Sequence, residues 1–158
     1  MAKTKVFLGG TCNNSTWRDK LISLLKIDYF NPVVDDWTPE CQDEEIRQRE
    51  LCDYCLYTIT PKMTGVYSIA EVVDDSNKRP EKTILCVLDE DNESSFSETQ
   101  IKSLKQVKEM VKNNGANVFD SLEDIASFLN KTNKNDLIEN YIIKKLKIKK
   151  KEERKNGK

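Results

Sequence analysis

Short apolar runs alternate with longer amphipathic stretches along most of the chain. The runs, rich in β-branched and aromatic residues, occupy residues 5–8, 29–34, 54–60, 83–88 and 117–119. A glycine, a proline or an acidic residue follows each of them. Runs of this length that end at turn-forming residues predict five strands, and the runs without polar alternation predict strands covered on both faces.

Between the runs, apolar residues recur every three to four positions, which is the spacing of one helix face. Ile101, Leu104, Val107 and Val111 form one such set. We expect helices over residues 17–25, 41–52, 66–77, 97–114, 121–129 and 136–148. Strands and helices that alternate in this order predict an α/β fold, with a five-stranded parallel sheet, right-handed crossovers and helices on both faces.

The length of 158 residues suits one domain, which we place at residues 1–131. Residues 132–158 are predicted to add a C-terminal helix and a basic tail. Residues 144–158 hold 8 Lys and 1 Arg against 2 Glu, a net of +7, so the other residues carry −8 of the total of −1. We expect a frayed, solvated helix end; an arm that binds a polyanion is the alternative, although no aromatic residue interleaves with the lysines.

The five cysteines are odd in number and irregularly spaced, which is typical of reduced thiols in a cytoplasm. Cys52 and Cys55 have the spacing of a redox or zinc pair, but no second pair follows. Buried structural thiols, no metal and no cofactor are therefore the expectation. The N-terminus has no signal-peptide core and no stretch is long enough to span a bilayer, so we expect a cytoplasmic protein without membrane contact.

The chain contains no histidine. Catalytic triads built on imidazole and histidine-ligated metal sites are therefore excluded. Any acid–base chemistry has to come from Asp, Glu, Tyr, Lys, Cys or water.

Ligands of an open parallel sheet bind beyond the carboxyl ends of its strands. The loops at that edge are predicted at residues 9–16, 35–39, 61–65 and 89–95. Polar and aromatic residues gather in the first three of these loops. The topology alone thus predicts a pocket there.

The residues Gly9, Gly10 and Thr11 allow the backbone to approach a ligand closely, and their amides suit a phosphate or a sugar hydroxyl. A plain tight turn is the alternative. Arg18, one turn into the next helix, is a candidate for gripping a phosphate or carboxylate, against a surface ion pair.

The loop at residues 35–39 places Trp37 outside regular structure, where it is either a lid on the core or a platform for a planar ligand. Asp36 is a hydroxyl or base acceptor, or a helix-capping residue. Glu71 lies about one turn into its predicted helix, among apolar residues whose packing would raise its pKa. An exposed acid that offsets the helix dipole is the alternative for Glu71.

These motifs together resemble the nucleoside 2-deoxyribosyltransferase-like family, whose relatives include deoxynucleoside-monophosphate N-glycosidases. The resemblance covers about residues 4–130. It rests on the segments Lys5-Val-Phe-Leu-Gly-Gly-Thr11, Trp17-Arg18, Phe30-Asn-Pro-Val-Val-Asp-Asp-Trp37, Asp53-Tyr-Cys-Leu-Tyr-Thr-Ile-Thr-Pro61 and Gly65-Val-Tyr-Ser-Ile-Ala-Glu-Val-Val73.

The resemblance implies a flavodoxin-like (Rossmann-like) parallel sheet, no cofactor and a homo-oligomer. It implies that Glu71 is a nucleophile that attacks the anomeric carbon, and that Asp53 helps to protonate and orient the base. The implied substrate-binding residues are Gly9, Gly10, Thr11, Trp17, Arg18, Asp36, Trp37, Thr64, Gly65 and Ser68. Thr64, Gly65 and Ser68 stand where the transferases carry a further acid and the hydrolases a serine.

The sequence therefore predicts an enzyme that cleaves the N-glycosidic bond of a (deoxy)nucleoside or nucleoside monophosphate, by hydrolysis or base exchange. Breaking this bond passes through an oxocarbenium-like state that a carboxylate can trap, and no histidine or metal is needed. Two alternatives are kept. One is a non-catalytic binder of a nucleotide-derived ligand, and the other is a glycohydrolase acting on NAD or a cyclic ADP-ribose-like molecule.

Overall fold

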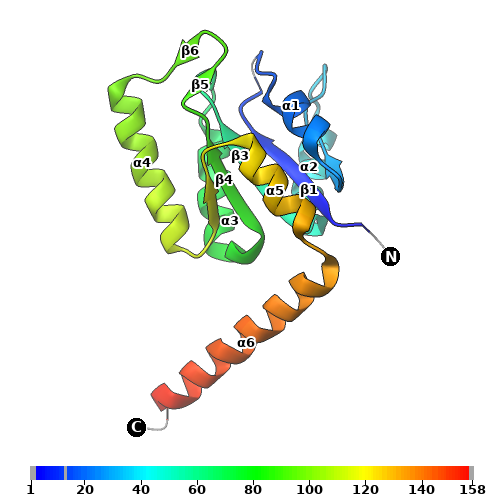
Figure 1. Cartoon of the computed structure of the whole chain (residues 1–158), viewed down its shortest axis with the longest axis vertical. Helices are drawn as coiled ribbons and strands as arrows, with labels where there is room; N and C mark the ends of the chain where they lie inside the picture. Colours follow the sequence, from blue (N-terminus) through cyan, green and yellow to red (C-terminus); the bar gives the residue numbers. More distant parts are fainter. Residues whose placement is uncertain (1–2, 13, 157–158) are drawn as a thin grey trace.

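Five parallel strands form the central sheet in the computed structural model of the chain, which describes residues 3–12 and 14–156 (Figure 1). They are β1 (Lys5–Gly10), β2 (Asp28–Phe30), β3 (Tyr54–Ile59), β4 (Thr83–Val87) and β7 (Asn117–Phe119). Their order is β2-β1-β3-β4-β7, and every pair is parallel. The predicted flavodoxin-like sheet is confirmed, and its strand order reverses between β1 and β3.

The central strands β3 and β4 are buried along their whole length. Their apolar residues have no polar alternation because helices cover both faces of the sheet. Residues on alternate positions therefore enter two separate cores. In β3, Tyr54 and Leu56 belong to one core, whereas Cys55, Tyr57 and Ile59 belong to the other.

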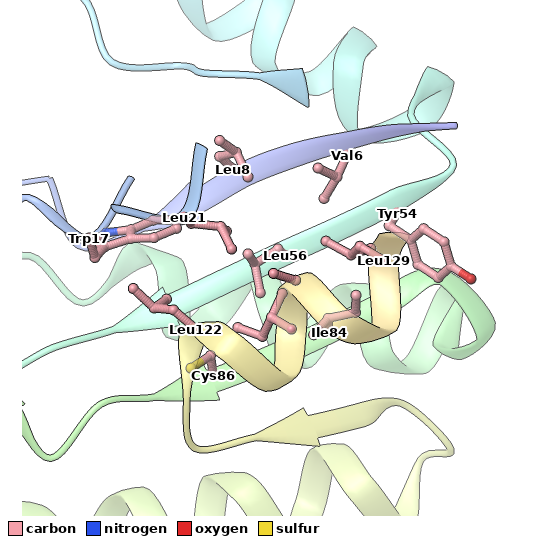
Figure 2. Close-up of a cluster of buried hydrophobic side chains, with 12 residues drawn as sticks. Val6, Leu8, Trp17, Leu21, Tyr54, Leu56, Ile84, Cys86, Leu122 and Leu129 are labelled. Atoms are coloured by element: carbon pink, nitrogen blue, oxygen red, sulfur yellow. The ribbon is translucent and has the colours of Figure 1, made fainter. Parts of the chain in front are cut away.

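The first core lies under α1 (Trp17–Leu24) and α5 (Leu122–Lys131), as Figure 2 shows. Trp17 and Leu21 from α1 pack there with Ile125 and Leu129 from α5, and all four are at most 1% exposed. The helical spacing predicted from Trp17 onward is thus the spacing of a core-facing stripe.

The second core lies under three helices on the opposite face. They are α2 (Pro39–Leu51), α3 (Tyr67–Lys78) and α4 (Glu98–Asn113), with a short 3-10 turn, η1 (Pro80–Lys82), after α3. Val72 of α3 and Leu104 and Val111 of α4 pack against the strands. This arrangement places α2 next to α3, so that polar residues of the two helices meet above the sheet.

Side-chain caps fix the starts of two helices. Ser97 and Gln100 form a capping box at α4, and the hydroxyl of Ser121 accepts a hydrogen bond from the backbone N–H of Asp124 at α5 (3.2 Å). Both satisfy backbone donors that the first helical turn leaves without partners. The start predicted at Ser121 from its acidic residue three positions later is confirmed.

The second strand and the loop after β4 differ from their prediction. The second strand ends at Phe30 instead of continuing to residue 34, because Pro32 cannot donate to a sheet ladder and the chain turns away toward the ligand-binding edge. The acidic loop after β4 contains a small antiparallel hairpin, formed by β5 (Glu90–Asp91) and β6 (Ser94–Ser95).

The last helix, α6 (Lys134–Asn156), extends away from the domain (Figure 1). Its 23 residues span about 35 Å, and it begins beside Tyr54 and Phe128 at the amino edge of the sheet. It is longer than the helix predicted at 136–148. Among the described residues, no helix is both long and apolar enough to cross a membrane.

Candidate active site

A cavity of about 450 Å³ opens at the carboxyl edge of the sheet, beside the point where the strand order reverses. Nine of the predicted site residues line it: Gly9, Gly10, Thr11, Arg18, Trp37, Thr64, Gly65, Ser68 and Glu71. They come from loops and helices that are far apart in sequence. The structure therefore brings most of the predicted residues together where the topology predicted a pocket.

Two glycines form the floor of the cavity. Gly10 has a φ of 116°, and a β-carbon on it would lie 2.1 Å from the carbonyl oxygen of Thr58. A β-carbon on Gly9 would lie 2.8 Å from the ring of Tyr57. Only glycine fits at either position, so the close packing of β1 against β3 leaves backbone exposed to a ligand.

Trp17 does not line the cavity but lies in the first core, where it holds the loop that does. Its side chain is 1% exposed in the first core, and Nε1 donates a hydrogen bond to the carbonyl of Thr11 at 2.7 Å. This placement separates Trp17 from the lining residues, and its role in substrate binding stays a prediction. A tryptophan on the buried stripe of an amphipathic helix fills the core.

Arg18 lines the cavity, yet much of its guanidinium is already engaged. Its Nε, Nη1 and Nη2 donate to the carbonyls of Leu8, Thr11 and Gly10 at 3.0, 2.6 and 3.2 Å. No carboxylate of the described residues lies within 4.0 Å of it, and burial lowers the pKa of Arg18 to about 10. Arg18 is thus a buried cation that shapes the loop.

Glu71 projects from the second turn of α3 toward the cavity, with 11% of its side chain exposed. Removal from water raises its pKa to about 7. Arg49 opposes this shift, whereas the negative charges of Glu45 and Asp75 add to it. Near neutral pH the carboxyl group of Glu71 therefore exchanges readily between its charged and neutral forms.

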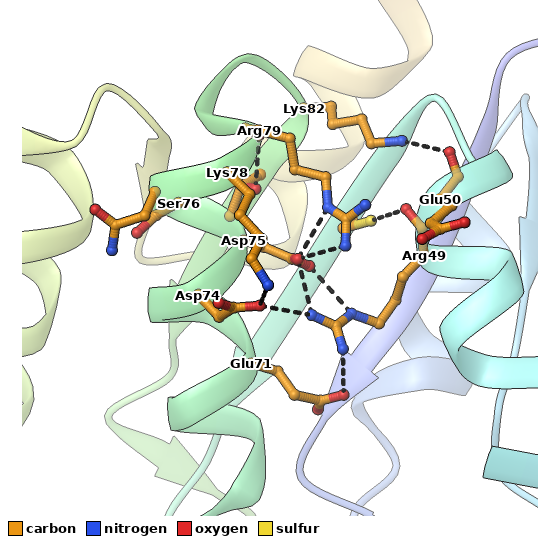
Figure 3. Close-up of polar contacts among 12 residues, drawn as sticks. Arg49, Glu50, Glu71, Asp74, Asp75, Ser76, Lys78, Arg79 and Lys82 are labelled. Carbon is orange, nitrogen blue, oxygen red and sulfur yellow. Dashed lines mark hydrogen bonds and ion pairs between the residues drawn. The ribbon is translucent and has the colours of Figure 1, made fainter. Parts of the chain in front are cut away.

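Arg49 of α2 joins Glu71 to a second, deeper carboxylate, as Figure 3 shows. Its Nη1 lies 3.3 Å from Oε1 of Glu71, while Nη2 and Nε donate to the two oxygens of Asp75 at 2.8 and 3.2 Å. Asp75 is fully buried and also accepts hydrogen bonds from Arg79 and from the hydroxyl of Tyr57. Burial alone would raise the pKa of Asp75, but these hydrogen bonds outweigh it and lower the pKa.

Glu45 is the lining residue that sequence reasoning missed. It reaches the cavity from α2, and its pKa is raised by burial against the opposing charges of Arg18 and Arg49. α2 contains several acidic residues, and no local feature of the sequence distinguishes Glu45 from its neighbour Glu44, which pairs with Arg47 at the surface. Only the packing of α2 beside α3 singles it out.

Apolar side chains form the outer wall. Val33 and Val34 line it from the loop after β2, together with Trp37, which is 60% exposed at the mouth. This favours the platform over the core lid among the two interpretations of Trp37. Asp36 is exposed on the same loop and does not line the cavity, so the structure does not place it with Trp37 as an acceptor.

Asp53 lies at the other edge of the sheet, directly before β3. Its carboxylate accepts a hydrogen bond from the backbone N–H of Lys5 at 2.8 Å and lies 3.6 Å from Nζ of Lys134. The structure does not bring Asp53 together with Glu71, and the role in protonating and orienting the base that the resemblance implied for Asp53 stays a prediction. A residue that precedes a parallel strand lies at the amino edge, the length of the strand away from the ligand-binding edge.

The remaining lining residues come from the loop before α3. Gly65 has open space where a β-carbon would stand, and Thr64 and Ser68 flank it at the rim. Among the described residues, no three His, Cys, Asp or Glu side chains are grouped so as to hold a metal ion. The ionisable groups that line the cavity are the carboxyls of Glu45 and Glu71, the guanidinium of Arg18, the thiol of Cys12 and the phenol of Tyr67.

A carboxylate-bearing cavity at the switch point of a parallel sheet is the arrangement in which open α/β domains bind small molecules. The family model described as nucleoside 2-deoxyribosyltransferase like matches residues 3–90, a range that holds every lining residue of the cavity. The chain belongs to the nucleoside 2-deoxyribosyltransferase-like family, as the resemblance predicted. Membership supports an enzyme of nucleoside glycosyl transfer that takes a nucleoside as its small-molecule partner. No curated protein and no solved structure matches the chain.

Proposed function

We propose that the protein cleaves the N-glycosidic bond of a (deoxy)nucleoside or nucleoside monophosphate, by hydrolysis or base exchange, with Glu71 as the nucleophile. One observation carries the proposal. The carboxylate of Glu71 faces a cavity at the ligand-binding edge while Arg49 holds it from behind. A cavity of about 450 Å³ is large enough for a nucleoside.

In the first step an oxygen of Glu71 bonds to the anomeric carbon as the bond from this carbon to the base breaks. The electron pair of the breaking bond leaves with the base. A carboxylate suits this role because it stabilises the positive charge that develops on the sugar and then captures it as an ester.

Glu45 supplies the proton that the departing base needs. Both carboxyl groups line one cavity, and burial raises the pKa of Glu45, which favours its protonated form before the reaction. In the second step the ionised Glu45 takes a proton from water, or from the incoming base, as that group attacks the anomeric carbon. The ester bond breaks, and Glu71 leaves as a carboxylate. We assign to Glu45 the role that the sequence resemblance gave to Asp53.

The apolar wall provides a place for the base. Trp37 offers an exposed ring at the mouth, and Val33 and Val34 continue the surface inward. Planar bases stack favourably on such surfaces without polar recognition. This leaves the sugar between Glu71 and the glycine floor.

The test is to incubate the protein with nucleosides, deoxynucleoside monophosphates and NAD, with and without a free base, and to identify the products by chromatography. Glu71→Gln is expected to lower base release by about 10³-fold or more while the protein stays folded. Glu109→Gln is the matched control, since it makes the same change on the exposed face of α4, outside the cavity lining.

Other results would replace the proposal. Free base released by Glu71→Gln at the wild-type rate would rule out Glu71 as the nucleophile. Thermal stabilisation by a nucleotide without any product would indicate a non-catalytic binder, and base release from NAD alone would indicate a glycohydrolase acting on NAD or a related molecule.

A further inference from the structure

Arg49 forms hydrogen bonds to two carboxylates, Asp75 and Glu71, with very different geometry. It holds Asp75 with two hydrogen bonds, at 2.8 and 3.2 Å, but reaches Glu71 with a single contact of 3.3 Å. A two-point contact fixes the plane of a guanidinium, whereas a single long contact is weaker and easier to break. Asp75 therefore holds Arg49 in place, whereas the contact between Arg49 and Glu71 is weak.

Asp75 is suited to hold Arg49 still. It is 0% exposed, and its oxygens also accept from Tyr57 of β3 and from Arg79, the residue directly after α3. Tyr57 is itself a buried member of the second core. A carboxylate with this many donors stays ionised and does not rotate.

The charges of the cluster balance only when Glu71 is ionised. Arg49, Lys78 and Arg79 are connected by ion pairs to Glu71, Asp74 and Asp75. Three positive charges thus meet three acidic groups. A neutral Glu71 would leave one positive charge of the cluster without its counter-charge, so the cluster opposes the burial that raises the pKa of Glu71.

We propose that Arg49, anchored by Asp75, is the positioning residue that favours the ionised form of Glu71 and aims it at the cavity, and that the long Arg49–Glu71 contact allows this carboxylate to move to the anomeric carbon. The inference rests on the proposed function. Arg49 does not itself line the cavity, so it acts through its contact with Glu71.

Other groups around Glu71 set the background for this role. Glu45 of α2 faces it across the cavity and disfavours its charge, as does Asp75 behind it. Arg18 of α1, Cys12 of the first loop and Tyr67 of α3 also line the cavity, and Asp74 lies behind the cluster. Arg49 is the cation that contacts the Glu71 carboxylate among the described residues.

The experiment is a pH profile of kcat/KM for base release, measured for wild type, Arg49→Met, Arg49→Lys and Arg47→Met. Arg49→Met is expected to move the rising limb upward by about one pH unit, so that its activity relative to wild type is about tenfold lower at pH 6 and approaches wild type at pH 9. Arg49→Lys keeps the charge and is expected to restore most of the profile. Arg47→Met, on the exposed side of α2, should leave it unchanged.

A loss of activity that is equal at every pH, or an unshifted profile, would overturn the inference, because a merely structural residue behaves in that way. Arg49→Gln, which can still donate to Asp75, replaces Arg49→Met if the latter does not fold. A titration of the ¹³C-labelled Glu71 carboxyl by NMR, assigned with Glu71→Gln, measures the same shift without turnover. It therefore separates a failure of this inference from a failure of the proposed function: an unshifted Glu71 overturns the first, and absent base release only the second.

Discussion

The hydroxyl of Thr11 accepts a hydrogen bond from the backbone N–H of Thr60 at 3.0 Å, which ties the first loop of the cavity to the end of β3. The backbone N–H of Thr11 donates to the carbonyl of Thr58 at 2.9 Å. Trp17 and Arg18 bind its carbonyl from the other side. The backbone N–H, the carbonyl and the hydroxyl oxygen of Thr11 are thus engaged in holding the floor, and Thr11 is 3% exposed.

Thr11→Val is predicted to destabilise the protein by about 1–3 kcal/mol, because it leaves the buried N–H of Thr60 without an acceptor at nearly unchanged volume. Urea unfolding measures this change. Thr11→Ser keeps the hydroxyl and is the control; if both variants lose the same stability, the hydrogen bond is not the cause.

Gly10→Ala is predicted to cost about 2–5 kcal/mol, because it combines a positive φ with a β-carbon 2.1 Å from the backbone of Thr58. Gly65→Ala is the matched substitution, since nothing lies within 4 Å of its β-carbon. It should change stability by less than about 1 kcal/mol while raising KM if substrate passes over the rim. Thermal unfolding of the two variants decides the matter, and equal losses would contradict the geometry of the floor.

The stability of the protein is predicted to fall as the pH rises from 4.5 to 7 through the titration of Glu71. Its pKa is raised from an ordinary 4.5 to about 7, so in this range the folded state binds more protons than the unfolded state. The stabilisation is complete below pH 4.5 and lost above pH 7.

Glu71→Gln does not titrate at this position, so the free energy of unfolding of the variant relative to wild type should rise by up to about 3 kcal/mol between pH 4.5 and pH 8. Denaturant unfolding at the two pH values measures it. A difference that is independent of pH would contradict the burial of this carboxyl group.

Cys12 is predicted to be the thiol whose alkylation stops base release. It is exposed and lines the cavity, whereas Cys52, Cys55 and Cys86 are buried, and burial raises the pKa of the Cys55 and Cys86 thiols to about 12. Iodoacetamide should inactivate wild type and Cys41→Ser at similar rates, and bound nucleoside should slow both. Cys12→Ser should keep its own starting activity under the same treatment; continued inactivation would point to another thiol.

The fold was predictable because its signals are local. β3 and β4 are continuous apolar runs, and the stripe from Trp17 to Leu21 has the period of a core-facing helix. Where tertiary packing decides the end of an element, the prediction was wrong. The strand expected to continue through Val34 stops at Phe30. Val33 and Val34 line the cavity instead of pairing in the sheet.

The site was predictable only in part, for a similar reason. The loops at the carboxyl edge follow from topology, and with them the positions of Glu71 and the glycine floor. The topology also places a residue directly before β3 at the amino edge, which is where Asp53 lies. The family resemblance had instead implied that Asp53 acts on the base of the substrate. Glu45 and Arg49 depend on how α2 turns about its axis beside α3, and an almost uniformly charged helix carries no sequence signal for that rotation.

The position of α6 has a practical consequence. It starts at the amino edge of the sheet and runs outward for about 35 Å, so the seven lysines of residues 144–155 lie on the side opposite the cavity. An amine-reactive resin that captures the protein through these lysines would hold it with the cavity mouth turned away from the resin. The same geometry makes the C-terminus the natural attachment point for a fused reporter domain.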